Sequence, residues 1–335
     1  MNPDARPTPS LSTVKKLFPG VFMLEGEVGG RPLQLTYLKG NLASLLFDTG
    51  CTNDPQKFIA PQIKEAGGDP SKLTWIVNSH PDADHTGGNH EMKKIAPNAR
   101  LACGDADRAL CEHPETLFKK RYDAHRENHD LFYEGDTLKW LKDESGMQPQ
   151  PIEVTFRGGE HIRIGDDWEI EILSTPGHAH GHLTIFDPKH EAAYGADSLH
   201  GSVYLSLKGE PVFCPTYAQV DDYLNTIQLT EHLPITTYLG CHWPLKKGSQ
   251  IAEFCTESRA YAEKAERLML SSLKKPHTLK ELCIALGPKL GDWPRAVDLD
   301  LAYAFNGHLV RLLARNIIQG RVRHEKPRIL EFEMA

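Results

Sequence analysis

The sequence predicts an α/β fold with a smaller helical domain at its C-terminal end, and three observations lead to this expectation. Up to about residue 248, short apolar runs bounded by Gly, Asn and Asp alternate with amphipathic segments, as in strands interleaved with helices. From residue 249 onward, long helical periodicity replaces this rhythm. The 335 residues, 40% hydrophobic and 25% charged, suffice for one large domain and one small one.

The first half begins with a polar lead-in, residues 1–19, and continues with alternating elements. Strands are predicted over residues 20–28, 33–40, 42–50, 72–80 and 99–105. Helices are predicted over residues 54–68 and 87–97, each next to a pair of glycines. Residues 106–150 break the rhythm because they are charged and rich in aromatic residues without strand alternation, so we expect a helical insertion there.

The second half returns to strands and then changes character. Strands are predicted within residues 151–177, 182–197 and 235–244, with a helix over residues 217–233. Three helices follow, over residues 249–273, 277–287 and 299–318, and a hairpin over residues 320–334. Three helices followed by a two-stranded ribbon is the order of a winged helix. We therefore expect one large domain, residues 20–248, and a winged-helix-like domain, residues 249–335.

Composition narrows the class of protein. The formal net charge is −7, which disfavours non-specific binding to nucleic acid and leaves a small-molecule substrate as the expectation. There is no apolar run long enough for a membrane span and no apolar signal core at the start. The seven cysteines lack C-x-x-C spacing, which favours reduced thiols in the cytoplasm. A homodimer through the insertion or the tail is a further expectation.

A dense group of ligand-type side chains occurs in the stretch "NSHPDADHTGGN", residues 78–89. Imidazole nitrogen and carboxylate oxygen are the usual ligands of Zn, Fe and Mn. His80, Asp82 and Asp84 are spaced by two, so an extended loop would point all three to one side, and His85 follows directly. The 17 histidines of the chain make a search for further ligands worthwhile.

Three more such residues follow strand-like runs, each where a loop begins. His178 occurs in "STPGHAHGH", Asp197 in "YGADSLHG" and His242 in "LGCHWP". One cluster alone is moderately specific, whereas four in this order strongly indicate a metal site. The neighbouring histidines are expected to support the fold around the ligands, and these are His180, His182 and His200.

The ordered set resembles the signature of the metallo-β-lactamase superfamily of metal-dependent hydrolases. That signature is H-x-H-x-D-H, then a histidine in a P-G-H setting, a bridging aspartate and a last histidine. The likeness spans about residues 20–245, and "LLFDTG" at residues 45–50 matches a further strand and loop of the family. It implies a four-layer αββα sandwich with the metals at one edge between the sheets. The tail resembles the small domain of the β-lactamase-like protein 2 subgroup.

The resemblance also implies the ligands and the chemistry. It assigns a first metal site to His80, Asp82 and His178, a second to Asp84, His85 and His242, and a bridging role to Asp197. Two zinc ions per chain are implied, with hydrolysis by a metal-bound hydroxide that the catalytic Asp84 orients. Asp48 is expected to order the loop rather than to bind metal.

Asp82 departs from the family, which has histidine at this position. Its extra negative charge would neutralise a two-metal core, and its harder oxygen favours Fe or Mn over Zn. The flavodiiron proteins have a glutamate there, so a diiron oxidoreductase is one alternative. Another is a weakened first site beside a firmly filled second one.

The substrate is left open by the sequence. An ester, lactone or thioester of a small molecule is the expected target, and a metal-dependent endoribonuclease or phosphodiesterase is the alternative that the tail suggests. Arginines that could contact phosphates in the tail are Arg311, Arg315, Arg321 and Arg323, and a solvated face is the competing interpretation.

Four aromatic residues of the insertion could line or cover a substrate pocket, or could pack the insertion onto the body of the protein. They are Tyr122, Phe132, Tyr133 and Trp140. Trp243, beside His242, is a further candidate for the pocket wall.

Overall fold

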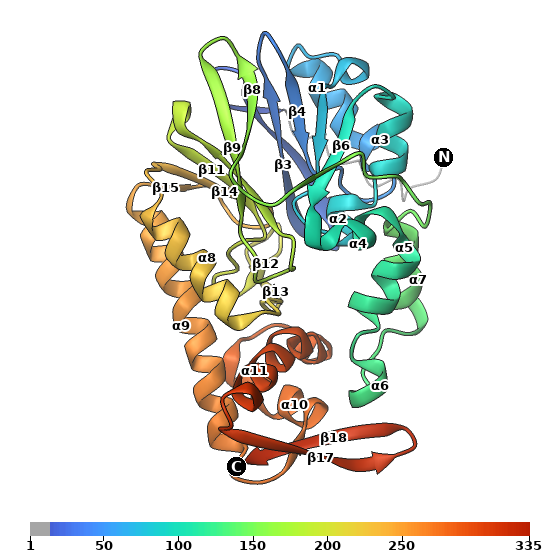
Figure 1. Ribbon diagram of the computed structural model, residues 1–335, viewed down its shortest axis with the longest axis vertical. Helices are drawn as coiled ribbons and strands as arrows, with labels where there is room; N and C mark the ends of the chain where they lie inside the picture. Colours follow the sequence, from blue (N-terminus) through green and yellow to red (C-terminus); the bar gives the residue numbers. More distant parts are fainter. Residues whose placement is uncertain (1–13) are drawn as a thin grey trace, which may run out of the picture.

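Two β-sheets face each other in the computed structural model, which describes residues 14–335 (Figure 1). The first sheet has seven strands in sequential order. They are β1 (Lys15–Phe18), β2 (Val21–Val28), β3 (Arg31–Lys39), β4 (Ser44–Phe47), β5 (Trp75–Val77), β6 (Arg100–Gly104) and β7 (Val154–Phe156). Strands β1 to β4 pair antiparallel and β4 to β7 pair parallel. Strand β1 falls within the segment expected as a lead-in, and residues 1–13 of that segment lie outside the described residues.

The second sheet has six strands in the order β15-β14-β11-β10-β9-β8. They are β8 (Glu160–Gly165), β9 (Trp168–Ser174), β10 (Leu183–Asp187), β11 (Ala192–Ala196), β14 (Thr237–Gly240) and β15 (Lys246–Lys247). The pair β11 and β14 is parallel and the other pairs are antiparallel. A separate ribbon joins β12 (Tyr204–Leu205) to β13 (Pro211–Phe213).

Side-chain alternation along the strands builds separate cores on the two faces of the sheets. In β4, Leu45 and Phe47 belong to the core between the sheets, whereas Leu46 packs with the outer helices. Those outer elements of the first sheet are η1 (Pro55–Ile59), α1 (Ala60–Glu65), η2 (Pro70–Lys72) and α3 (Asn89–Ile95). Beside the second sheet lie α8 (Val220–His232) and α9 (Ser249–Ser272), and the turn η5 (Pro188–His190) follows β10 (Figure 1). The predicted α/β class and the four layers αββα are confirmed.

Residues 106–150 form a string of short helices that leaves the sandwich and runs toward the C-terminal end of the molecule (Figure 1). The string consists of η3 (Asp105–Asp107), α4 (Arg108–Glu112), α5 (Pro114–Leu117), the π-helical turn η4 (Phe118–Tyr122), α6 (Arg126–His129) and α7 (Gly135–Glu144). His129 of α6 packs on Phe332, with 6.1 Å between the ring centroids. The insertion therefore links the first sheet to the terminal hairpin.

The C-terminal region contains the predicted helices and hairpin. Its elements after α9 are β16 (His277–Thr278), α10 (Leu279–Leu290), η6 (Arg295–Leu301), α11 (Ala302–Ala314), β17 (Ile318–Glu325) and β18 (Arg328–Met334). Thr278 and Glu281 form a reciprocal capping box that begins α10. The strands form a three-stranded sheet in the order β16-β18-β17.

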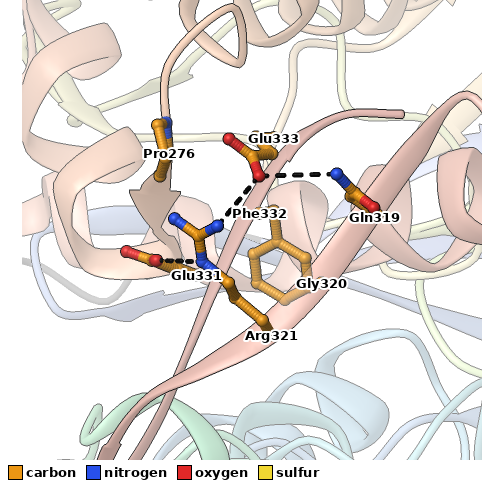
Figure 2. A pocket seen from close by; sticks show the side chains of 7 residues that line it. All are labelled: Pro276, Gln319, Gly320, Arg321, Glu331, Phe332 and Glu333. Carbon is orange, nitrogen blue, oxygen red and sulfur yellow. Dashed lines mark hydrogen bonds and ion pairs between the residues drawn. The ribbon is translucent and has the colours of Figure 1, made fainter.

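The tail arginines named above are paired with acidic side chains. Arg321 contacts Glu331 and Glu333 across the hairpin, beside a shallow surface hollow (Figure 2). The other three arginines also form ion pairs. Arg323 contacts Glu281 and Glu331, Arg311 contacts Glu266 and Asp221, and Arg315 contacts Asp221. This pairing agrees with the competing interpretation of a solvated face. Among the described residues, every helix is too short or too polar to span a bilayer.

Candidate metal centre

Asp48, which follows β4, holds the loop that follows β5. Asp48 is buried and adopts a left-handed backbone conformation with φ of 70°. Its carboxylate accepts the Ser79 backbone N–H and hydroxyl, both at 2.7 Å, and lies 2.8 Å from His85 Nδ1. These contacts fix both ends of the loop, and they agree with the expectation that Asp48 orders it.

The four histidines of the expected ligand set are buried, and each one uses Nδ1 for a protein partner. The partners are the Ser79 hydroxyl for His80 (2.9 Å), Asp48 for His85 (2.8 Å), the Thr216 carbonyl for His178 (3.1 Å) and the Pro32 carbonyl for His242 (2.7 Å). A hydrogen bond at Nδ1 fixes the orientation of an imidazole and leaves Nε2 for a ligand. Nε2 of each of the four histidines is therefore directed into the same centre.

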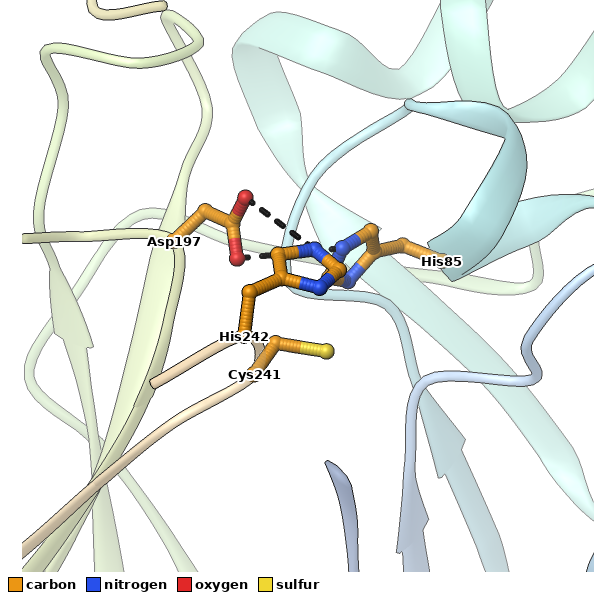
Figure 3. Close-up of side chains that lie close together, drawn as sticks. All are labelled: His85, Asp197, Cys241 and His242. Carbon is orange, nitrogen blue, oxygen red and sulfur yellow. Dashed lines mark ion pairs between the residues drawn. The ribbon is translucent and has the colours of Figure 1, made fainter. Parts of the chain in front are cut away.

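The residues expected to form the second site converge from loops that follow three strands. His242 Nε2 lies 3.2 Å from Asp84 Oδ2 and 3.6 Å from Asp197 Oδ2. His85 Nε2 lies 3.9 Å from one oxygen of each of the two aspartates. Figure 3 shows Asp197, His85 and His242 together, with Cys241 adjoining. Burial raises the pKa of the Cys241 thiol to about 12, although His85 acts to lower it, so the thiol is neutral at pH 7.

Several ligand-type atoms have no hydrogen-bond partner within residues 14–335. Among the expected ligands they are His80 Nε2, His85 Nε2 and Asp197 Oδ1, and Nε2 of the neighbouring His182 and His200 is unpartnered as well. Buried polar atoms are normally paired, and orphaned ones on imidazole and carboxylate point to an ion that they would bind. The donor atoms of His80, His178 and Asp197, like those of His85, Cys241, His242 and Asp197, lie within 4.8 Å of one another. The donor set therefore fits a divalent metal.

Asp82, the residue that departs from the family, is paired with a cation from the insertion. Arg121, on the turn η4, contacts both carboxylate oxygens through Nε and Nη2, the second at 2.6 Å. The same Nη2 lies 2.9 Å from His178 Nε2, and Nη1 donates to the His178 carbonyl at 3.1 Å. Arg121 is 9% exposed, so this is a nearly buried bidentate pair.

Burial and charge act in opposite directions on the pKa values of the cluster. Burial raises the pKa of Asp82, but Arg121 and His178 outweigh it and hold that pKa well below 3.8. Burial likewise raises the pKa of Asp84, and His85 and His242 bring it below the usual value. Burial lowers the pKa of His85, yet Asp48 and its neighbours raise it well above 6.5. The charged form is thus favoured for Asp82, Asp84 and His85 by their oppositely charged neighbours.

A cavity of about 400 Å³ opens above these residues. Asp84, Asp197 and His242 contribute to its wall, together with residues from the insertion and from η6 and α11. The four insertion aromatics all line it, and they are Tyr122, Phe132, Tyr133 and Trp140. The prediction that Trp243 forms part of the wall is wrong. Trp243 is buried beneath Tyr204, which lines the cavity instead, and its indole N–H donates to the Val203 carbonyl at 3.1 Å.

Among the lining residues that sequence reasoning missed are Arg31, Arg121, Tyr204 and Tyr303. Arg121 is 39 residues from its partner Asp82 and lies in a run of basic residues with no motif. The one signal was Asp82 itself, because a buried extra carboxylate requires a cation nearby. That signal predicts the charge of the partner without identifying it.

Comparison with known proteins identifies the family. The family model of the metallo-beta-lactamase superfamily matches residues 30–242. A hydroxyacylglutathione hydrolase of Pelagibacter ubique is 25% identical over 223 residues, which are 65% of this chain and 72% of that protein. Glyoxylase B2 of Dictyostelium discoideum is 31% identical over 127 residues, 38% of this chain, and the match spans only 35% of that relative's length.

Two solved structures share the fold over nearly the whole chain. A metallo-beta-lactamase family protein from Thermus thermophilus has a TM-score of 0.73 at 18% identity, covering 96% of this chain and 100% of its own. A beta-lactamase domain protein from Burkholderia ambifaria has a TM-score of 0.75 at 15% identity, covering 99% and 96%. The family match covers most of the chain and includes the whole candidate centre, so the chain belongs to the metallo-beta-lactamase superfamily of metal-dependent hydrolases.

Proposed function

We propose that this protein hydrolyses an ester, lactone or thioester of a small molecule with the help of bound zinc. The observation that carries the proposal is the set of unpartnered imidazole and carboxylate atoms beside the cavity. A divalent ion held by these atoms would supply a hydroxide at neutral pH and polarise the acyl oxygen. The likeness to a hydroxyacylglutathione hydrolase supports the thioester among the three bonds.

The chain's own residues account for substrate binding and for the handling of the proton. The cavity volume lies in the range that holds a small molecule, and its aromatic wall suits an apolar acyl or leaving group. Asp84 lines this cavity as an ionised carboxylate, so it can orient a water molecule and accept its proton. Arg31 also lines the cavity, and its positive charge suits a substrate that carries a carboxylate.

The test is hydrolysis of a panel of chromogenic substrates by the purified protein. The panel contains esters of increasing acyl length, a hydroxyacyl thioester, a lactone, a β-lactam and a phosphodiester. We expect turnover of an ester, lactone or thioester that is lost on chelation and returns when zinc is added. Turnover of the phosphodiester alone, or turnover that chelation leaves intact, would contradict the proposal.

The two alternative functions find little support. The tail arginines that could contact phosphates are paired with glutamate or aspartate, which disfavours an endoribonuclease. The diiron oxidoreductase depended on Asp82 as a metal ligand, and Arg121 binds both oxygens of that carboxylate. Neither alternative has an observation of its own in its favour.

The proposal also includes a reducing compartment and a homodimer. All seven cysteines are buried and unpaired, which supports a reducing compartment such as the cytoplasm. The homodimer stays a prediction, and light scattering of the purified protein would test it. A mass near 37.5 kDa would mean a monomer and twice that mass a dimer.

A further inference from the structure

The contacts around Arg121 bear on how many metal ions this centre binds. A guanidinium carries five N–H groups and no acceptor. Nε and Nη2 contact Asp82, Nη2 also lies 2.9 Å from His178 Nε2, and Nη1 donates to the His178 carbonyl. The arginine therefore contacts two of the three residues that the family uses only for its first metal.

His178 is held between the Thr216 carbonyl on one side and Asp82 and Arg121 on the other. Its Nδ1 lies 3.1 Å from the Thr216 carbonyl, which can only accept, so Nδ1 carries the proton. His178 Nε2 and Asp82 Oδ2 lie 2.9 Å apart, and both lie within 2.9 Å of Arg121 Nη2. Nη2 of Arg121 thus lies against two of the side chains that the family uses at its first metal site.

The donors that remain at the first site are few. His80 Nε2 and Asp197 Oδ1 have no hydrogen-bond partner, but protein metal sites normally use three or four protein ligands. A divalent ion held by these two atoms would also lie close to the guanidinium, and like charges at such a distance repel strongly. The second site keeps its full set of donors, namely Asp84, His85, Asp197 and His242.

We propose that this centre binds one divalent ion, in the second site, and that the Arg121 guanidinium takes the place of the first ion between Asp82 and His178. Before a hydroxide binds, one divalent ion and one guanidinium bring three positive charges, which equal the three negative charges of Asp82, Asp84 and Asp197. Asp82 and Arg121 form a matched pair, which explains why the usual histidine is absent from position 82.

Two tyrosines, Tyr122 and Tyr303, hold Arg121 at this place. Tyr122, the next residue, accepts the Ala83 backbone N–H at 2.9 Å and so ties the turn η4 to the metal loop. Tyr303 of α11 donates to the Arg121 carbonyl at 3.4 Å, and the guanidinium carbon lies 5.7 Å from the centre of its ring. The insertion and the tail therefore position the side chain before any metal binds.

The inference rests on the proposed metal-dependent function and is tested by counting zinc rather than by activity. Each variant is saturated with zinc, freed of excess by gel filtration and measured by elemental analysis. We expect about one zinc per chain in the wild type and about two in Arg121→Gln, because the substitution frees both Asp82 and His178. Arg121→Lys keeps the positive charge and should stay at one. Arg126→Gln, which removes an exposed arginine of the same insertion, is the matched control and should also stay at one.

The outcomes separate this inference from the proposed function. Two zinc ions in the wild type would overturn the inference and leave the hydrolase proposal standing. One zinc in folded Arg121→Gln would show that Arg121 does not exclude the second ion, and would overturn it too. No zinc in the wild type would overturn both proposals. If thermal unfolding shows that Arg121→Gln is unfolded, the double variant Asp82→His with Arg121→Met is the second test. It removes the guanidinium and restores the family ligand, so it should bind two ions, and a count of one would contradict the inference.

Discussion

At the scale of single residues, the carboxylates of this centre have different roles because they have different partners. Asp48 holds the loop through Ser79 and His85, Asp82 binds Arg121, and Asp84 lies beside the cavity and contacts His242. Charge alone would make these aspartates equivalent. Because their surroundings differ, Asp48 is a positioning residue, Asp82 is the partner of a cation and Asp84 is a candidate proton acceptor.

Asp84→Asn should abolish most activity, because an amide does not accept a proton from water. We expect a fall in kcat of about 10²–10⁴-fold on the best substrate of the panel. The zinc content should be measured in the same preparation, since Asp84 is also an expected ligand. Activity close to that of the wild type with zinc retained would assign the proton transfer to another group.

Asp48→Asn should weaken metal binding although Asp48 is not an expected ligand. The amide cannot accept from both Ser79 and His85 as the carboxylate does, so His85 loses its orientation. Loss of such a supporting contact typically costs about 10–100-fold in metal affinity. Competition with a chromogenic chelator measures this, with the exposed Asp69→Asn as the control. Equal affinities for the two variants would mean that the loop is ordered without Asp48.

At the scale of elements, the strands and the main helices followed from residue pattern, but the contacts of the insertion did not. The expected ligands from His80 to His242 each follow a strand, and the structure brings them together because those strands end at the same edge of the two sheets. Arg121 could not be predicted in this way. Its position depends on how short helices fold back over the sandwich, and no local periodicity encodes that path.

Tyr122 provides a direct measure of how the insertion is held. In Tyr122→Phe, the buried Ala83 N–H loses its acceptor, which typically costs about 1–3 kcal/mol of unfolding free energy. Chemical denaturation would measure the change. Lys119→Gln, an exposed substitution on the same turn, should stay within about 0.5 kcal/mol of the wild type. If both variants behave alike, the hydrogen bond does not anchor the insertion.

At the scale of the whole molecule, the cavity is shared by the sandwich, the insertion and the tail, so no single segment forms it. Residue pattern predicted a metal site and a separate tail, whereas the packing of the tail over the site was not predictable from local sequence. Tyr133 of the insertion donates a hydrogen bond to Asp300 of η6, and this contact joins two walls of the cavity. Its strength depends on the charge of Asp300.

Burial raises the pKa of Asp300 to about 6, although Tyr133 and Arg31 act to lower it. Between its ordinary pKa near 4 and about 6, the folded protein holds a proton that the unfolded chain has lost. Folding stability from this group is therefore present at low pH and declines as the pH rises through that window.

The variant Asp300→Asn keeps an acceptor for Tyr133 without the charge. It should raise the unfolding free energy by roughly 1–2 kcal/mol at pH 8 and leave it nearly unchanged at pH 4. Thermal and denaturant unfolding at both pH values, with exposed Asp292→Asn as the control, measure the difference. A gain that is equal at the two pH values would mean that ionisation of Asp300 does not strain the junction between insertion and tail.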